Sequence, residues 1–256
     1  MPTTSPTIPI IFLAFANDHV DESKFLRGLK KEREDIRAVL KPAEQAGLCK
    51  LVIEPNASIK NILDTFQEYQ DQIAIFQYGV HANGFQLLLE TLEGDHAQAH
   101  SEGLVSFFSK QKGLKLIFLN GCSSQQQALD LVAAGIPAVV GTSQSINDDI
   151  ATKLAVRFYT GMAQGKHIER AWQEATDELK IEKGTANIRD LYCDGMDHED
   201  SPTVDQFPWN IYYRAGASAI KEWDLPEAVA NPLFGLPEIP PTHYLPASPF
   251  LFFDES

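Results

Sequence analysis

Two reactive side chains stand in similar settings, each close behind an apolar run and flanked by glycine. His81 lies in GVHANG, which follows QIAIFQY, and Cys122 lies in NGCSS, which follows LKLIFL. A histidine beside a cysteine takes the thiol proton, and the thiolate that forms attacks a carbonyl carbon. Backbone N–H groups of the turn around Cys122 can then bind the oxyanion. The pair therefore predicts covalent cysteine chemistry.

Each of these residues has an ordinary explanation when it is taken alone. A cysteine after a strand is commonly a small buried hydrophobe, and a histidine between glycines is commonly a turn residue. The other two cysteines, Cys49 and Cys193, form no CxxC pair, so neither a structural zinc site nor a disulfide framework is expected. We expect substitution of either cysteine to leave activity unchanged. We also expect no metal and no cofactor.

The elements that position His81 and Cys122 follow from hydrophobic patterning. Apolar runs of strand length occur at residues 8–16, 49–55, 72–78, 114–119 and 136–141, and 86–91 is open as a strand or short edge. Helical periodicity, with Ser58 as one N-cap, covers residues 24–46, 58–69, 97–110, 125–134, 147–165 and 168–183.

Strands that alternate with helices pair in parallel and carry helices on both faces. The sequence therefore predicts an α/β fold, a three-layer α/β/α sandwich with a mostly parallel sheet. Ligands bind such sheets beyond the carboxyl ends of the strands, where His81 and Cys122 are expected. Neighbouring parallel strands would bring the two loops side by side.

The pattern changes after about residue 182. Helical periodicity fades, and prolines and aromatic residues accumulate. We expect one domain at residues 8–183 and a Pro/aromatic-rich extension or connector at 184–256, within which 208–213 (PWNIYY) can be a sheet strand. Proline-rich segments with many rings more often lie extended across a surface than act as flexible linkers.

Composition narrows the class of partner. The formal net charge is −14 and 44% of the residues are hydrophobic. An acidic protein repels phosphate backbones, so no nucleic acid is expected as a partner. MPTTSPTIPI has no basic region typical of a signal peptide, and no run approaches the roughly 20 apolar residues of a membrane span. We expect a cytoplasmic protein without membrane attachment.

Three stretches resemble the CHAT domain family of caspase-like cysteine peptidases, in the clan of caspases, separases and gingipains. They are IFQYGVHANG, LIFLNGCSS and AAGIPAVVGTSQSINDDIATKLAVRFYTGMAQGKHIERAWQEA. The resemblance spans roughly residues 8 to 180 and is most specific from Leu116 to Ala175. It implies a cysteine endopeptidase that hydrolyses protein or peptide substrates through a Cys–His dyad.

Carried over by position, the resemblance makes His81 the general base and Cys122 the nucleophile. The backbone amides of Ala82 and Cys122 match the family's oxyanion hole. Asp148 matches an aspartate that selects a basic P1 residue in several relatives, and its neighbour Asp149 is a second S1 candidate. For both aspartates, a role as N-cap of the following helix explains the residue about as well as a role in the S1 pocket.

Two departures from the family pattern keep an alternative open. The residue after the base is usually glycine but is Ala82 here, and a tryptophan common after the fifth strand is Gln144. If that glycine adopts a positive φ, alanine is strained there by roughly 1 kcal/mol or more. The alternative is a catalytically weak pseudoprotease that serves as an interaction or scaffold module. A third possibility, a ligand-binding doubly wound domain, lacks a GxGxxG or P-loop signature.

The sequence from Pro208 to Phe250 resembles connectors that join effector modules to downstream sensor domains in bacterial multidomain proteins of the STAND NTPase type. The resemblance implies that the 256 residues are the N-terminal effector module of a longer chain. Its partners would be downstream sensor or NTPase domains in that chain. Its role would be bacterial defence or programmed cell death, with the protease idle until the sensor assembles it.

Overall fold

A mixed sheet forms the centre of the computed structural model, which describes residues 8–16, 27–80, 96–121, 124–144, 146–183 and 207–230. Within these ranges the sheet has six strands in the order β2-β1-β3-β4-β5-β6. They span β1 Ile10–Ala16, β2 Lys50–Glu54, β3 Ile73–Val80, β4 Leu116–Asn120, β5 Ala138–Thr142 and β6 Trp209–Tyr213. The first five run parallel, and β6 pairs with β5 antiparallel.

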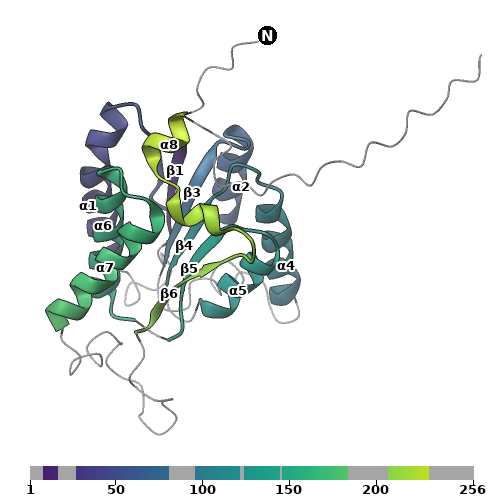
Figure 1. The fold of residues 1–256 in the computed structure, drawn as a ribbon. Helices are drawn as coiled ribbons and strands as arrows, with labels where there is room; N and C mark the ends of the chain where they lie inside the picture. Colours follow the sequence, from purple (N-terminus) through teal and green to yellow (C-terminus); the bar gives the residue numbers. More distant parts are fainter. Residues whose placement is uncertain are drawn as a thin grey trace, which may run out of the picture.

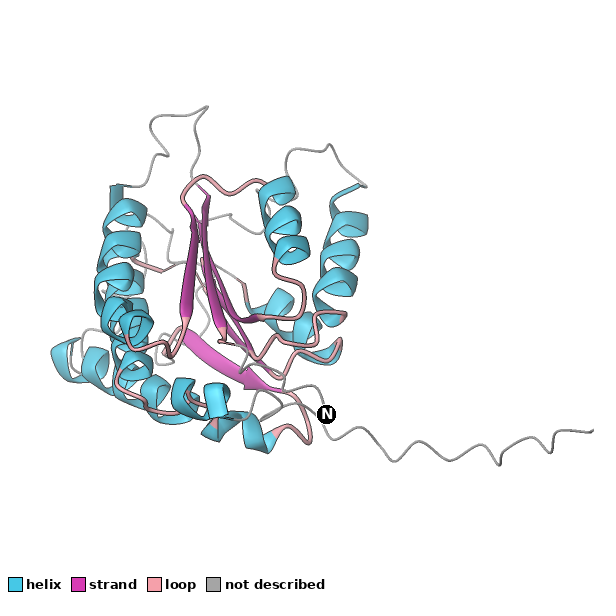
Figure 2. Ribbon diagram, turned by 90° about the horizontal axis from the view of Figure 1, so that it is seen from above, coloured by secondary structure: helices cyan, strands magenta, loops and turns pink. Residues whose placement is uncertain are grey.

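Helices cover both faces of this sheet (Figure 1). One face carries α1 Arg27–Gln45, α6 Asp148–Ala163 and α7 Ile168–Lys183, and the other carries α2 Ile59–Glu68, α4 His96–Ser109 and α5 Gln125–Ala133. Figure 2 shows the sheet edge-on between the two helical layers. The predicted three-layer α/β/α class is confirmed. The expectation at residues 86–91 lies outside the described part of the chain.

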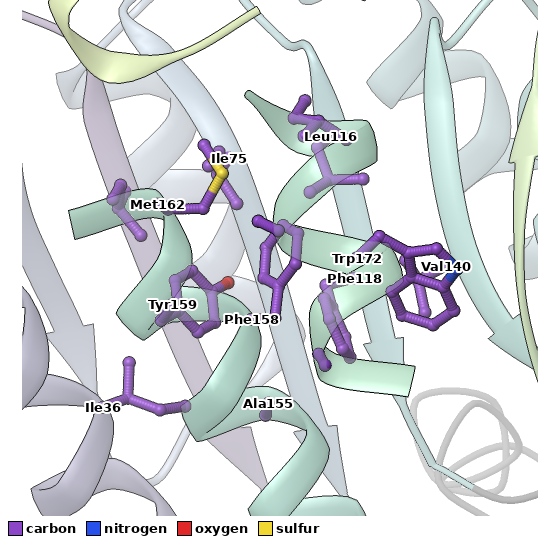
Figure 3. Close-up of a cluster of buried hydrophobic side chains, with 14 of the residues drawn as sticks. Ile36, Ile75, Leu116, Phe118, Val140, Ala155, Phe158, Tyr159, Met162 and Trp172 are labelled. Carbon is purple, nitrogen blue, oxygen red and sulfur yellow. The ribbon is translucent and has the colours of Figure 1, made fainter. Parts of the chain in front are cut away.

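The central strands are apolar along their whole length because both of their faces are buried. Along β4, Leu116 and Phe118 enter the core beneath α1, α6 and α7, whereas Ile117 and Leu119 enter the core on the opposite side. Figure 3 shows the first core, in which Phe158 and Tyr159 of α6 and Trp172 of α7 meet the sheet. The ring of Phe118 lies 5.5 Å from that of Phe158.

The opposite core is rich in phenylalanine. Phe66 of α2 makes edge-to-face contacts at ring distances of 5.4 Å with both Phe76 of β3 and Phe108 of α4. Ser58 begins α2 as its N-cap, as predicted from the sequence, and the structure adds a capping box with Asn61. The two cores enclose β3 and β4, so both strands are buried on both faces close to their carboxyl ends.

Residues 207–230, which the sequence analysis assigns to the extension, pack onto the sheet and α7. β6 forms the sheet edge, followed by the 3-10 helix η4 Ser218–Glu222 and by α8 Leu225–Ala230. Trp223, between them, is 1% exposed, and its carbonyl accepts a hydrogen bond from the N–H of Ile168 at the start of α7. This part of the extension therefore contributes to the same core as residues before 183. Sequence periodicity missed both short helices.

Candidate active site

The carboxyl ends of β3 and β4 define the candidate active site. The two strands are parallel neighbours, and Gly79 of β3 pairs with Asn120 of β4. In the sequence, His81 and Cys122 each come two residues after this pair. His81, Ala82 and Cys122 lie outside the described residues, so the site is characterised here through the residues that flank them.

Thr142 is hydrogen-bonded to Gly121 and Ser124, the described residues on either side of Cys122 and Ser123. Its hydroxyl donates to the carbonyl of Gly121 at 2.5 Å, and the N–H of Ser124 lies 3.3 Å from the same hydroxyl. In return, the Ser124 hydroxyl accepts the N–H of Thr142 at 3.0 Å. Thr142 is fully buried at the end of β5. The residues on both sides of the pair Cys122–Ser123 are thus tied to a third strand.

The next helix begins close to Cys122 in sequence. α5 starts at Gln125, and its N-cap residue Ser124 makes no side-chain cap hydrogen bond because its hydroxyl is engaged with Thr142. The first N–H groups of a helix have no partner within the helix, and they carry the positive end of its dipole. This arrangement favours an anion, such as a thiolate, next to the start of the helix.

Asp148 and Asp149 form the first turn of α6, but neither is its N-cap. Asn147 has that role, and its side-chain oxygen accepts the N–H groups of Asp149 and Ile150 at 3.0 and 3.3 Å. The expectation that one of the two aspartates caps the helix is therefore wrong. Both aspartates are exposed.

The aspartates lie beside the first turns of α1, at the edge of the sheet where the strands end. A Cβ atom placed on Gly28 would be 3.9 Å from the Cβ of Asp148. The charge of Asp148 acts on Glu32, and that of Asp149 acts on Lys31. Two exposed acidic side chains, Asp148 and Asp149, therefore lie at this edge together with the cation Lys31.

A polar cluster beneath this edge was not anticipated from the sequence. The Glu32 cluster, as we call it, contains Glu32 of α1, Gln77 of β3, Asn120 of β4, and Thr152 and Tyr159 of α6, all buried. The Oε1 atom of Glu32 accepts hydrogen bonds from Gln77 Nε2 at 2.6 Å and from Asn120 Nδ2 at 2.8 Å. Thr152 adds a third side-chain hydrogen bond to the carboxyl.

Burial changes the acidity of Glu32. The loss of water raises the pKa of its carboxyl to about 7, and the negative charge of Asp148 adds to the rise. Hydrogen bonds from Asn120, Gln77 and Thr152 oppose it. The side chain therefore changes its charge near neutral pH, unlike an exposed glutamate.

A signal for the Glu32 cluster was present in the sequence. Glu32 falls between Leu29 and Ile36 on the buried stripe of α1, where helical spacing calls for an apolar residue. Gln77 is a polar residue within the apolar run at 72–78, and Asn120 directly follows the run at 114–119. A polar residue at a buried position needs a partner, and three such residues could have been assigned to one another.

The described residues contain one further cysteine, Cys49, and neither a cluster of metal ligands nor a helix that could span a membrane. Cys49 is buried, and desolvation with the nearby charge of Glu44 raises the pKa of its thiol to about 12, so it is an unreactive thiol. No group of three potential metal ligands is found in the described ranges. Among the helices described, none is long and apolar enough to cross a membrane.

Comparison with known proteins identifies a family. The model of the CHAT domain family matches residues 2–217. A comparison with curated protein sequences finds no significant match. Among solved structures, the chain is similar to the Drosophila initiator caspase Dronc, with 8% sequence identity, a TM-score of 0.41, and coverage of 69% of this chain and 74% of that one.

Proposed function

Because this chain belongs to the CHAT domain family, we propose that it is a cysteine endopeptidase in which Cys122 is the nucleophile and His81 the general base. The observation that carries the proposal is the register of β3 and β4. Gly79 and Asn120 are directly paired, and His81 and Cys122 each follow two residues later. Such equal spacing from adjacent parallel strands favours contact between the two side chains.

The proposed reaction begins when His81 takes the proton of Cys122. The thiolate attacks the scissile carbonyl, and backbone amides of Ala82 and Cys122 stabilise the tetrahedral oxyanion. The protonated His81 then gives its proton to the leaving amine, and water hydrolyses the thioester that remains. The start of α5 and the hydrogen bonds of Thr142 support this proposal, because they favour a fixed turn and an anionic sulfur.

We further propose that Asp148, with Asp149 as the second candidate, binds a basic P1 side chain. Asn147 is the N-cap of α6, and both aspartates lie in the first turn that follows it. Both are exposed at the edge where the strands end. A substrate lysine or arginine would meet a negative field there.

The regulatory context belongs to the same proposal. We propose that the protease is a cytoplasmic effector in bacterial defence or programmed cell death. In this role it is activated by sensor or NTPase domains downstream in a longer chain of the STAND type. The alternative is a pseudoprotease that acts as a scaffold, for which Ala82 is the supporting residue.

Cleavage-site profiling tests this function. The chain is incubated with a diverse peptide library, and new termini are identified by mass spectrometry. We expect the wild type to cut after lysine or arginine, Cys122→Ala to be inactive, and His81→Ala to be slower by about two orders of magnitude or more. Asp148→Asn should weaken the preference for a basic P1 residue, with Asp149→Asn as the matched variant.

The outcomes separate the alternatives. Cleavage that survives in Cys122→Ala contradicts the nucleophile assignment. An unchanged P1 profile in both aspartate variants contradicts the S1 assignment. A chain that cuts nothing, alone or within its longer parent protein, supports the pseudoprotease.

A further inference from the structure

The Glu32 cluster joins the two strands that precede His81 and Cys122 in the sequence. Glu32 is 2% exposed, and its Oε1 atom joins two strands through Gln77 and Asn120. Gln77 precedes His81 by four residues, and Asn120 precedes Cys122 by two. The carboxyl thus links the two strands from which the proposed catalytic residues follow.

A purely structural purpose would be served better by apolar side chains. The cluster leaves Gln77 Oε1, Asn120 Oδ1 and the hydroxyl of Tyr159 buried without a hydrogen-bond partner. Each such atom opposes folding, and a buried charge opposes it further. Leu29 and Ile36, the neighbours of Glu32 on the same stripe, pack without this penalty. Polar groups that persist at such a position point to a role other than stability.

The geometry restricts what that role can be. Asn120 Nδ2 also lies 3.4 Å from the carbonyl of Ala151 in α6, so the same amide contacts both helices that cover this end of the sheet. Through the hydrogen bonds of Glu32, α1 contacts the ends of β3 and β4 in addition to the direct pairing of the two strands, at a site that no substrate needs to touch.

We propose that Glu32 is a positioning residue for the dyad, and that its hydrogen bonds to Gln77 and Asn120 fix the relative placement of the strand ends that His81 and Cys122 follow. This inference rests on the proposed roles of His81 and Cys122. The ionised carboxylate accepts from both amides at once. A proton adds to the other oxygen, Oε2, and removes the negative charge that strengthens both hydrogen bonds to Oε1.

The proton on Glu32 thereby makes the placement dependent on pH. The pKa of Glu32 near 7 lies in the range where a Cys–His pair works. The titratable groups that face it in the described residues are Asp148 and Tyr159, both on α6. β3 and β4 present only the neutral amides. Burial and the charge of Glu32 raise the pKa of Tyr159, which therefore stays neutral.

Alkylation of Cys122 by iodoacetamide tests the inference, since only the thiolate reacts and no substrate is required. The rate is followed in the full chain by peptide mass spectrometry, from about pH 5 to about pH 9. The variant is Glu32→Gln, which keeps the shape and a hydrogen-bonding head but cannot ionise. The matched control is Glu34→Gln, the same change at an exposed position of the same helix.

We expect Glu32→Gln to raise the midpoint of the alkylation profile by about one pH unit, which lowers the rate at neutral pH about tenfold. Glu34→Gln should superimpose on the wild type, and buried Cys49 should stay unmodified throughout. If Glu32→Gln does not fold, as judged by circular dichroism, Gln77→Met takes its place. This variant removes the hydrogen bond between Glu32 and β3, and it should raise the alkylation midpoint in the same way.

A Glu32→Gln midpoint that equals or falls below that of the wild type overturns the inference, as does an equal shift in Glu34→Gln. The peptide-cleavage assay is independent of this readout. A chain that cuts peptides but shows no shift keeps its proposed function and loses the role of Glu32. A chain that cuts nothing but shows the shift keeps the coupling between Glu32 and Cys122 and loses the protease.

Discussion

Glu32 is an acid that folding removes almost entirely from water. Its hydrogen bonds from Gln77, Asn120 and Thr152 only partly replace hydration, because the pKa still rises from 4.5 to about 7. The folded state therefore binds a proton more tightly than the unfolded chain does. For an acid with a raised pKa, stability from this group is present below pH 4.5 and is lost as the pH rises through about 7.

A first prediction follows for stability against pH. The shift in pKa corresponds to about 3 kcal/mol. Relative to the wild type, Glu32→Gln should gain up to about that amount in free energy of unfolding between pH 4.5 and about pH 8. Urea unfolding at the two pH values measures the difference.

The exposed Glu34→Gln variant is the control for this measurement. The difference in free energy of unfolding between Glu34→Gln and the wild type should change little between the two pH values. An exposed carboxyl has a similar environment in the folded and the unfolded chain. If Glu32→Gln behaves like this control, then the carboxyl of Glu32 is hydrated in solution and its pKa is ordinary.

At the scale of elements, α5 and β5 are in close contact next to Ser124, the first described residue after the proposed nucleophile. A Cβ atom on Gly141 would lie 2.8 Å from the Cβ of Ala128 and 3.1 Å from the carbonyl oxygen of Ser124. Neither neighbour is the end of a flexible side chain. Only glycine allows α5 to approach β5 this closely. The hydrogen bond from the Thr142 hydroxyl to the carbonyl of Gly121 depends on the same approach.

A second prediction tests this contact. Gly141→Ala should lower the free energy of unfolding by about 1–3 kcal/mol, the usual effect of overpacking. It should also reduce peptide cleavage, because relief of the clash moves Ser124. Chemical denaturation and the cleavage assay measure the two effects.

Gly103→Ala is a matched substitution with the opposite expectation. Gly103 lies in α4, is exposed, and has no neighbour within 4 Å of an added Cβ. Replacing glycine by alanine in a helix stabilises it by roughly 0.5–1 kcal/mol. Equal effects of the two substitutions would show that the contact between α5 and β5 is looser than the distances indicate.

At the scale of the whole molecule, residues 207–230 complete the fold. β6 protects the edge of β5, which would otherwise expose unpaired backbone groups. Ile220, Trp223 and Leu225 are at most 1% exposed and belong to the core beneath α6 and α7. Residues 207–230 therefore contribute to the same folding equilibrium as the sheet.

Our third prediction concerns Trp223. Trp223→Ala should destabilise the chain by about 3–5 kcal/mol, as large truncations in cores do. Thermal unfolding should show one transition at a lower temperature, because the tryptophan packs into the shared core. Ile181→Ala is the control, since that side chain is 82% exposed and its loss should change stability by no more than about 0.5 kcal/mol. A small effect of Trp223→Ala would mean that residues 207–230 dock only weakly.

The sequence alone determined the parallel layers, because burial on both faces of a strand leaves an apolar run and amphipathic helices leave a 3.6-residue period. The capping role of Ser58 was equally local, since its partner Asn61 lies three residues away. The order of His81 and Cys122 after successive strands also followed from this alternation, whereas the pairing of β3 with β4 is seen only in the sheet.

Other features were decided only by tertiary structure. Asn147, Asp148 and Asp149 are all good N-caps by residue type, and only the structure shows that the first of them has this role. The two short C-terminal helices have too few residues for a periodic signal. Glu32, Gln77 and Asn120 each break or end an apolar pattern, but nothing in a one-dimensional pattern joins residues so far apart. Their shared hydrogen bonds exist because the sheet and α1 bring three distant polar groups into one buried place.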